Sequence, residues 1–366
     1  MPVPPSHLDP DSATRWRRAR ARAVDHLLAA VAGCRRVDEL VVRGSVLLKA
    51  WYGAAAREPG DLDFVVTTKG WGPEDGRTDR MFAEIARRAE ESSGTDVSGV
   101  RVVATRALDE TLRAYDRAPG RRFGLPWRAE GLPGGTVYLD FVFDERLPSA
   151  PELVEIPHSD GTGTHLLIGA TPEQSLAWKL LWLVEDDHPR PQDLHDAVLL
   201  AEHVALPVSL LRTTFMAFDP SHGGHPFTVD SLALDRVKPF ASNHDHPGST
   251  DGELPARLIR ALAPTFAAGA GAGASGYVRA ARRLSPWIEK CRALRGDSRA
   301  LLAVITADSW HLDSALVVYR EVIGPGTCDL AEAARVVTGH WDARPAQVGH
   351  EGWHPHVVAE AFGRLG

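Results

Sequence analysis

The sequence predicts an α+β fold, in which a small mixed sheet with flanking helices is followed by a helical C-terminal region. Short runs of β-branched and aromatic residues are interspersed with helical patterns up to about residue 165. From Thr171 onwards the pattern becomes helical. This order of elements fits α+β better than a regular βαβαβ repeat. We therefore expect two domains, residues 1–165 and residues 166–366.

The first half is expected to open with a tail and a long helix. Residues 1–13 are rich in proline and are typical of a mobile tail. A helix is expected at 13–32, because Gly33 is a common helix end. Polar loops are expected at 69–79 and 118–135. The other expected elements are, in order, a strand at 40–43, a helix at 45–57, a strand at 61–67, a helix ending at 88, and strands at 100–105 and 136–143.

The second half is expected to consist of helices separated by irregular segments. Thr171 followed by Pro172 has the form of a helix N-terminus, with threonine at the cap and proline at the first position. Pro189 and Pro191 should end this helix, and a second one should run to about His203. An irregular connection is expected at 218–256. The remainder reads as helical, with loops near 269–276 and 322–327.

Composition excludes several classes of protein. No run of apolar residues is long enough for a transmembrane helix, and the N-terminus lacks the apolar core of a signal peptide. The three cysteines are scattered without C-x-x-C spacing, which argues against a disulfide framework and against a cysteine zinc site. We expect a cytoplasmic protein without a membrane partner.

Charge gives no support to binding of extended nucleic acid, since the formal net charge is −7. A local basic groove stays possible. Arginines crowd two places, the stretch with Arg17, Arg18, Arg20 and Arg22 and the pair Arg121 and Arg122. We interpret both groups as solvated side chains.

A phosphate cradle is predicted where the strand at 40–43 meets the next helix. Gly44 lets the backbone approach a ligand closely, and Ser45 begins the helix and adds a hydroxyl donor. A helix N-terminus presents free N–H groups and the positive end of the helix dipole, which suits a triphosphate.

A metal site is predicted at Asp61 and Asp63. Residues two apart on a strand project from the same face, so Leu62 and Phe64 should point into the core. Two carboxylates on one face repel each other unless a cation lies between them, and Mg²⁺ prefers such oxygen ligands. The alternative is a D-x-D in a turn or at a solvated strand edge.

Asp140 is the candidate third metal ligand. It lies in the apolar run that ends at Phe143, where an acid is costly unless it is paired or bound to metal. It would also help remove the proton of an acceptor hydroxyl. The alternative is that a nearby arginine pairs with it.

Lys179 is the one charged residue in the run SLAWKLLWLV, and it lies within or beside the apolar helix face. A buried ammonium needs an anionic partner, which a triphosphate would supply; alternatively, the lysine extends its head into water. Asp193 and Asp196 are three residues apart and face one direction, so either is expected to orient Lys179 or the acceptor. Alternatively, they only complement the helix dipole.

These residues resemble the DNA polymerase β-like nucleotidyltransferase superfamily and, within it, the AbiEii/AbiGii (MenT-like) toxins of type IV toxin–antitoxin and abortive-infection systems. The resemblance covers about residues 40–200 and depends on a G-S turn, an R-x-x-x-D-x-D run, and a later lysine followed by D-x-x-D. The matching residues are Gly44, Ser45, Arg57, Asp61, Asp63, Lys179, Asp193 and Asp196.

The resemblance implies a metal-dependent nucleotidyltransferase core at 1–165, and a helical domain at 166–366 that contributes Lys179 and Asp193 to the site. It implies transfer of a nucleoside monophosphate from an NTP, with Mg²⁺ or Mn²⁺, to an RNA acceptor, the 3′ end of tRNA in studied relatives. A cognate antitoxin is the other implied partner. By the resemblance, Asp61, Asp63, Lys179 and Asp193 are catalytic, Asp61 and Asp63 hold metal, and Gly44, Ser45, Arg57, Lys179 and Asp196 bind nucleotide. Asp140 joins the expected catalytic and metal-binding residues because of its place in the apolar strand.

Two departures from the family pattern leave the acceptor open. The segment between Ser45 and Asp61 has 15 residues, longer than usual, and Pro59 stands where relatives often have Ser or Thr. The alternatives are a nucleotidyltransferase that acts on a small molecule or a protein, which the acidic net charge favours, and a non-catalytic nucleotide-binding module.

Overall fold

A computed structural model describes residues 4–112, 119–186, 189–220, 222, 232, 253–267, 276–307, 310–342 and 355–365. The chain divides into two compact units, Met1–Trp178 and Lys179–Gly366, and each is considered by itself. The assignment of functions to two domains stays a prediction.

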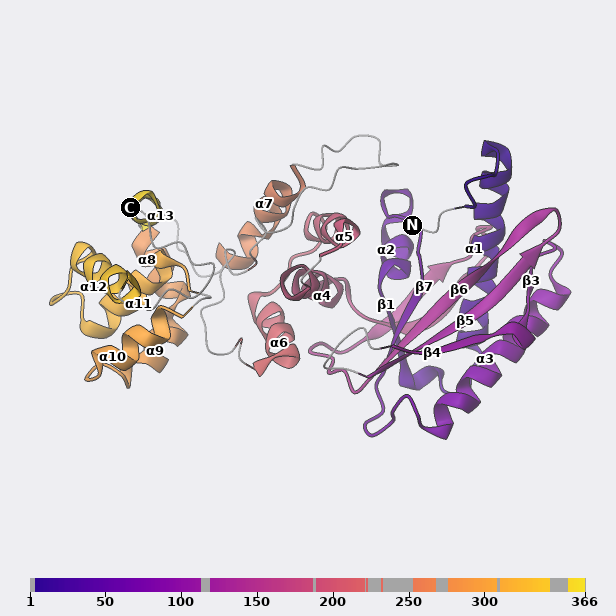
Figure 1. Ribbon diagram of the computed structural model, residues 1–366, viewed down its shortest axis with the longest axis horizontal. Coiled ribbons are helices and arrows are strands. Elements are labelled where there is room, and N and C mark those ends of the chain that lie inside the picture. Colours follow the sequence, from indigo (N-terminus) through magenta and orange to yellow (C-terminus); the bar gives the residue numbers. More distant parts are fainter. Residues whose placement is uncertain are drawn as a thin grey trace. The chain divides into compact units, whose positions relative to one another are not determined.

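The first unit is a mixed α/β body (Figure 1). Its helices are α1 (Pro10–Ala32), α2 (Ser45–Tyr52) and α3 (Gly76–Thr95), with short 3₁₀ turns at Val37–Glu39, Gly53–Ala55 and Ala104–Arg106. Its strands are β1 (Leu40–Arg43), β2 (Leu62–Val66), β3 (Arg101–Val102), β4 (Leu108–Leu112), β5 (Gly120–Ala129), β6 (Leu132–Phe143), β7 (Glu152–Pro157) and β8 (Thr164–Gly169).

All eight strands join one mixed sheet, as expected for the α+β class. The strand order is β3-β5-β6-β2-β1-β8-β7, and β4 pairs with β5. The β2–β6 and β1–β8 pairs are parallel, while the other neighbours are antiparallel. The strands β1, β2 and β6 therefore lie side by side at the centre of the sheet, although β6 comes much later in the sequence.

One face of the central strands is closed by helix α3. Phe64 on β2 stacks on Phe141 of β6 at 5.2 Å between ring centroids, and Phe82 of α3 contacts Phe141 at 5.1 Å. All three rings are almost fully buried. Because side chains alternate along a strand, the residues between these phenylalanines project from the other face of the sheet. The prediction that Leu62 and Phe64 point into the core is confirmed.

The segment expected as a loop at 118–135 is instead most of a long antiparallel hairpin. Strands β5 and β6 pair from Gly120 opposite Val142 to Ala129 opposite Leu132. Two glycines, a proline and paired arginines give β5 the composition of a loop. Its pairing with strands on both sides outweighs that local preference.

Other boundaries also differ from the sequence predictions. Helix α1 begins at Pro10, because the Asp9 side chain caps it by accepting a 2.9 Å hydrogen bond from the Ser12 N–H, so the predicted tail is too long. Helix α2 ends before Gly53, short of the expected residue 57, and α3 continues to Thr95. The strand expected at 100–105 shrinks to two residues. Strands β4, β7 and β8 were not expected.

The second unit is helical, as the sequence predicts, and helix α4 leads into it. The helices are α4 (Pro172–Glu185), α5 (Pro191–Ala201), α6 (Val208–Phe218), α7 (Leu254–Ala267), α8 (Gly276–Arg283), α9 (Ser285–Arg292), α10 (Ser298–Ile305), α11 (Leu312–Ile323), α12 (Leu330–Asp342) and α13 (Pro355–Leu365). Most of the irregular segments expected at 218–256 and 269–276 lie outside the described residues. The break expected near 322–327 separates α11 from α12.

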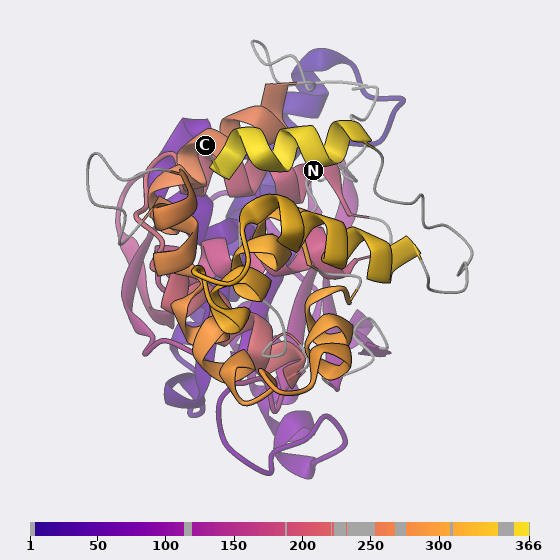
Figure 2. The same ribbon diagram turned by 90° about the vertical axis from the view of Figure 1, so that its left-hand side faces the viewer.

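Helices α8 to α13 share a hydrophobic core of their own (Figure 2). Helix α11 is its centre, and it contacts α8, α9, α10, α12 and α13. Trp287 and Trp310 meet edge to face in this core, at 5.9 Å between ring centroids. Within the described parts of the chain, no helix combines the length and apolar character needed to cross a membrane.

Candidate active site

Four charged side chains form a row across the centre of the sheet, opposite the face that α3 covers. Asp63 on β2 is the register partner of Asp140 on β6. Arg43 on β1 lies opposite Asp63, and Arg122 on β5 lies opposite Asp140. Residues in register project from the same face, so two carboxylates are flanked by two guanidinium groups.

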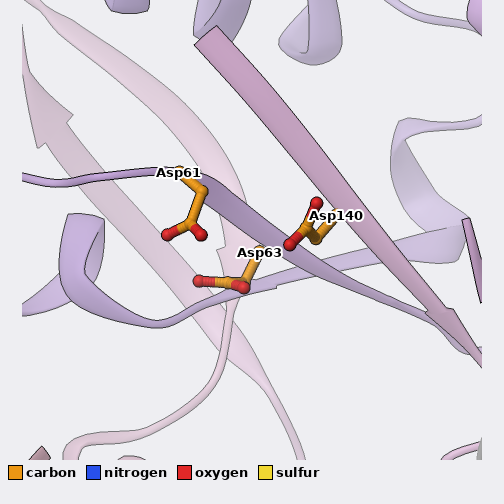
Figure 3. Close-up of side chains that lie close together, drawn as sticks. All are labelled: Asp61, Asp63 and Asp140. Carbon is orange, nitrogen blue, oxygen red and sulfur yellow. The ribbon is translucent and has the colours of Figure 1, made fainter. Parts of the chain in front are cut away.

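The three acids expected to bind metal form a cluster, in which Asp61 lies beside the two aspartates of this row. One carboxylate oxygen from each of Asp61, Asp63 and Asp140 lies within 4.8 Å of the others. Their side chains point toward a common space (Figure 3). Asp140 is buried, whereas Asp61 and Asp63 are half-buried, so the cluster stays open to a ligand on one side.

The turn at Gly44 brings the phosphate-binding candidate against these acids. Gly44 has φ +82°, a conformation that side-chain-bearing residues rarely adopt. A Cβ atom at this position would lie 2.3 Å from the Asp63 Oδ2 atom. Only glycine therefore permits the backbone of the turn to lie directly beside the Asp63 carboxylate.

Replacing Gly44 by alanine is expected to displace the Asp63 carboxylate and to lower the free energy of unfolding by about 1–3 kcal/mol. Gly53→Ala is a matched control: Gly53 also has positive φ, but a Cβ there meets no atom within 4 Å. Titration calorimetry with Mn²⁺ should show weaker binding in Gly44→Ala than in Gly53→Ala. Equal affinities would mean that the close approach at Gly44 does not position Asp63.

Ser45, the first residue of α2, is buried at 2% exposure, and its hydroxyl has no hydrogen-bond partner among the described residues. Gly44 caps the helix without a side-chain hydrogen bond, so no side chain satisfies the first N–H groups of α2 at its cap. An unpaired hydroxyl at the N-terminus of a helix suits an anionic ligand.

Arg20 supports the segment that leads into Asp61. It is 6% exposed and donates hydrogen bonds to the carbonyl oxygens of Pro59, at 2.8 Å, and Gly60. Its interpretation as a solvated arginine is wrong, because α1 packs its side chain under this loop. Arg57, the predicted nucleotide-binding arginine, lies buried in the same loop.

Arg122 is the residue that the sequence interpretation missed most clearly. Its Nε and Nη2 atoms donate to the two Asp140 carboxylate oxygens at 2.7 and 2.6 Å, and Nη2 lies 3.8 Å from Asp61. Asp140 is thus both a member of the acidic cluster and the partner of an arginine, the two alternatives that the sequence left open. Arg121, on the other face of β5, pairs with Asp79 and Asp109 instead.

Removal of the Arg122 charge is expected to strengthen Mg²⁺ or Mn²⁺ binding in the absence of nucleotide. The guanidinium competes with a cation for the Asp140 oxygens, so Arg122→Gln should lower the metal Kd roughly threefold to tenfold, or about 1 kcal/mol for a half-exposed ion pair. Titration calorimetry measures this, with Arg121→Gln as the control on the opposite face. A metal Kd that Arg122→Gln leaves unchanged would show that Arg122 does not compete for Asp140.

Arg43 closes the other end of the row. It is 4% exposed, and its Nη1 donates to both Glu145 carboxylate oxygens at 2.7 Å. Its guanidinium also lies over the Trp178 ring, 5.0 Å from the centroid. Arg43 is thereby held by Glu145 and Trp178.

The residues present fit a divalent cation of the Mg²⁺ type. All three side chains offer hard carboxylate oxygens, which Mg²⁺ and Mn²⁺ prefer. Three carboxylates this close repel one another unless a cation lies between them. A cation held here would lie beside the Gly44–Ser45 turn, the candidate phosphate-binding site.

Lys179, in the second unit, is the centre of a buried ion-pair cluster. Its Nζ lies 2.6 Å from Asp193 Oδ1 and 3.0 Å from Asp196 Oδ2, and it sits 5.1 Å from the Trp182 ring centroid. Lys179 is 4% and Asp196 1% exposed. The expectation that Asp193 and Asp196 face one direction agrees with these contacts, and the lysine does not extend into water.

The chain was compared with known proteins and protein families. No curated protein matches the chain. Residues 27–262 match the family described as nucleotidyl transferase AbiEii toxin, type IV toxin–antitoxin system. The match covers most of the chain and includes the cluster of Asp61, Asp63 and Asp140, the Gly44–Ser45 turn and the Lys179 cluster. The chain belongs to the AbiEii family of nucleotidyl transferase toxins.

Proposed function

We propose that this protein transfers a nucleoside monophosphate from an NTP to a hydroxyl group of an RNA, the 3′ end of tRNA, in a metal-dependent reaction that releases pyrophosphate. The observation that carries the proposal is the convergence of Asp61, Asp63 and Asp140 within 4.8 Å, beside the Gly44–Ser45 turn. Family membership supports nucleotidyl transfer from an NTP and an antitoxin partner.

In this proposal the three carboxylates hold Mg²⁺ or Mn²⁺, which would offset charge on the attacking and leaving oxygens. The α2 N-terminus and the Ser45 hydroxyl bind the phosphate chain. Asp140 also accepts the proton of the acceptor hydroxyl. Arg57, Lys179 and Asp196 bind nucleotide, and Asp193 is catalytic; these assignments come from the family motif.

The RNA acceptor is favoured by the family resemblance around Lys179, whereas the net charge of −7 favours a small molecule or a protein. The test incubates the full chain with each α-³²P-labelled NTP, Mg²⁺ and total tRNA. Label is expected on intact tRNA, and not on tRNA whose 3′ end has been oxidised with periodate. EDTA should abolish it.

Two outcomes would contradict the proposal in different ways. Label that appears only on small molecules or on protein would keep the transfer chemistry and replace the acceptor. Nucleotide binding without any transfer, in the presence of tRNA and metal, would indicate a non-catalytic nucleotide-binding module.

A further inference from the structure

We propose that helices α8 to α10 form a phosphate-binding surface for the RNA acceptor, an inference that rests on the proposed function and names which part of the chain holds the substrate. Residues 276–299 are called the basic stretch. They contain seven basic and two acidic residues, although the whole chain has a formal net charge of −7. The remaining residues, 300–366, contain eight acidic and four basic residues. Positive charge is therefore concentrated in the first three helices of this group, α8 to α10.

The charges of the basic stretch lie at the surface. Six of its seven basic side chains are exposed, and Arg283 is half-buried. Arg279 and Arg282 are three residues apart on α8, which places them as neighbours on one helix face. Helices α8, α9 and α10 have eight residues each, or about 12 Å each, and all three contact α11.

Carboxylates compensate little of this charge. In the part of the chain that the structure describes, Arg282, Arg283, Arg295 and Arg299 have no carboxylate partner. Arg292 pairs with Glu289 at 2.5 Å, but both side chains are more than half exposed, so this pair contributes little. Of these, Arg282 and Arg299 are exposed, while Arg295 is exposed and donates to the Ile323 carbonyl oxygen at 2.8 Å. Exposed guanidinium groups without a carboxylate partner suit contact with phosphate oxygens.

The surface fits a nucleic acid better than a protein partner. The centre of a protein–protein interface is usually apolar and poor in charge. Among the described residues of the basic stretch, Val278 is the single large hydrophobic side chain with substantial exposure. Trp287, the one tryptophan of the stretch, is buried under Lys290 and Arg212 and therefore serves the core. Binding through phosphates needs no apolar centre and depends on charge.

The position of the basic stretch in the chain supports a role in substrate binding. The family match ends at residue 262, so α8 to α13 lie beyond it. These helices have their own core, which is maintained without the exposed arginines. Binding of RNA phosphates needs positive charge, which the whole chain, with a formal net charge of −7, lacks and the basic stretch supplies.

The test measures binding of a fluorescently labelled tRNA pool to the full chain by polarisation, without NTP, over a range of salt concentrations. The variant Arg279→Gln/Arg282→Gln/Arg299→Gln removes three exposed charges. The control Arg87→Gln/Arg106→Gln/Arg335→Gln removes three exposed charges elsewhere. The first variant should bind at least about tenfold more weakly near 0.1 M salt, with a slope of log K against log[salt] reduced by about 2. The control should stay within about twofold of the native chain.

Equal affinity of the two variants would overturn the inference and leave an acidic protein partner as the explanation of the charges. The transfer assay separates this failure from failure of the proposed function. If the native chain labels tRNA and the basic-stretch variant does so with unchanged KM for tRNA, the inference fails and the function stands. If tRNA binds through the basic stretch but is never labelled, the surface stands and the proposed acceptor fails.

Discussion

Replacing Asp63 by asparagine is expected to remove nucleotidyl transfer while leaving the fold intact. Asp63 is the central member of the acidic cluster, since it lies in register with Asp140 and against Gly44. An amide has nearly the same shape but lacks the charge that holds a divalent cation. We expect transfer to fall by at least about 10²–10³-fold, the loss seen when one charge-stabilising group of an active site is removed.

The stability of Asp63→Asn should stay within about 1 kcal/mol of the native chain, because one of three mutually repelling charges is removed. Asp38→Asn, at an exposed aspartate just before β1, is the control and should keep full activity. Thermal unfolding with EDTA and with Mn²⁺ separates the effect of Asp63→Asn on the fold from its effect on metal binding. The native chain should gain stability from Mn²⁺, and Asp63→Asn should not. Transfer within tenfold of native in Asp63→Asn would rule out this cluster as the metal site.

Lys179→Met is expected to have the largest effect on stability. The substitution leaves Asp193 and Asp196 without their ammonium partner, and Asp196 is 1% exposed. An unpaired charge at such a site costs about 3–5 kcal/mol of the free energy of unfolding. Denaturant unfolding monitored by circular dichroism measures this loss.

A second variant separates the structural from the chemical role of Lys179. Lys179→Met/Asp196→Leu replaces the most buried pair by apolar side chains of similar size and should recover most of the lost stability. We expect this double variant to remain inactive, because the proposed phosphate-binding ammonium is still missing. Recovered activity in the double variant would show that Lys179 serves only the fold. A single variant as stable as the native chain would contradict the buried ion-pair account.

Local patterns in the sequence were sufficient for the parts of the site that depend on alternation along one strand. Asp61 and Asp63 were expected on one face of a strand with Phe64 on the other. Asp63 and Phe64 have these places on β2, and Asp61 lies one residue before the strand but still converges with Asp63. The Gly44–Ser45 turn was expected at a strand-to-helix junction, where α2 begins. In each case a few neighbouring residues decide the conformation, through strand periodicity and the conformational freedom of glycine.

Long-range pairing determined the other parts of the fold and of the site, and for these parts local composition led to wrong predictions. Strand β5 has glycine, proline and arginine in loop-like proportions, yet its neighbours β3 and β6 hold it extended. The arginines read as solvated include Arg20, which lies buried under the Asp61 loop, and Arg122, which pairs with Asp140. The partner of a long cationic side chain depends on which strand or helix folds against it, which composition does not reveal.

The sequence by itself determined which side chains are the candidates for the site, because carboxylates two apart on a strand and a glycine–serine turn before a helix are local patterns with few conformations. Asp140 was a candidate from the sequence, but only the tertiary structure shows that it lies beside Asp61 and Asp63 and that Arg122 is the arginine that shares its carboxylate. The reason is strand register: the parallel pairing of β2 with β6 and the antiparallel pairing of β6 with β5 align residues that are distant in sequence.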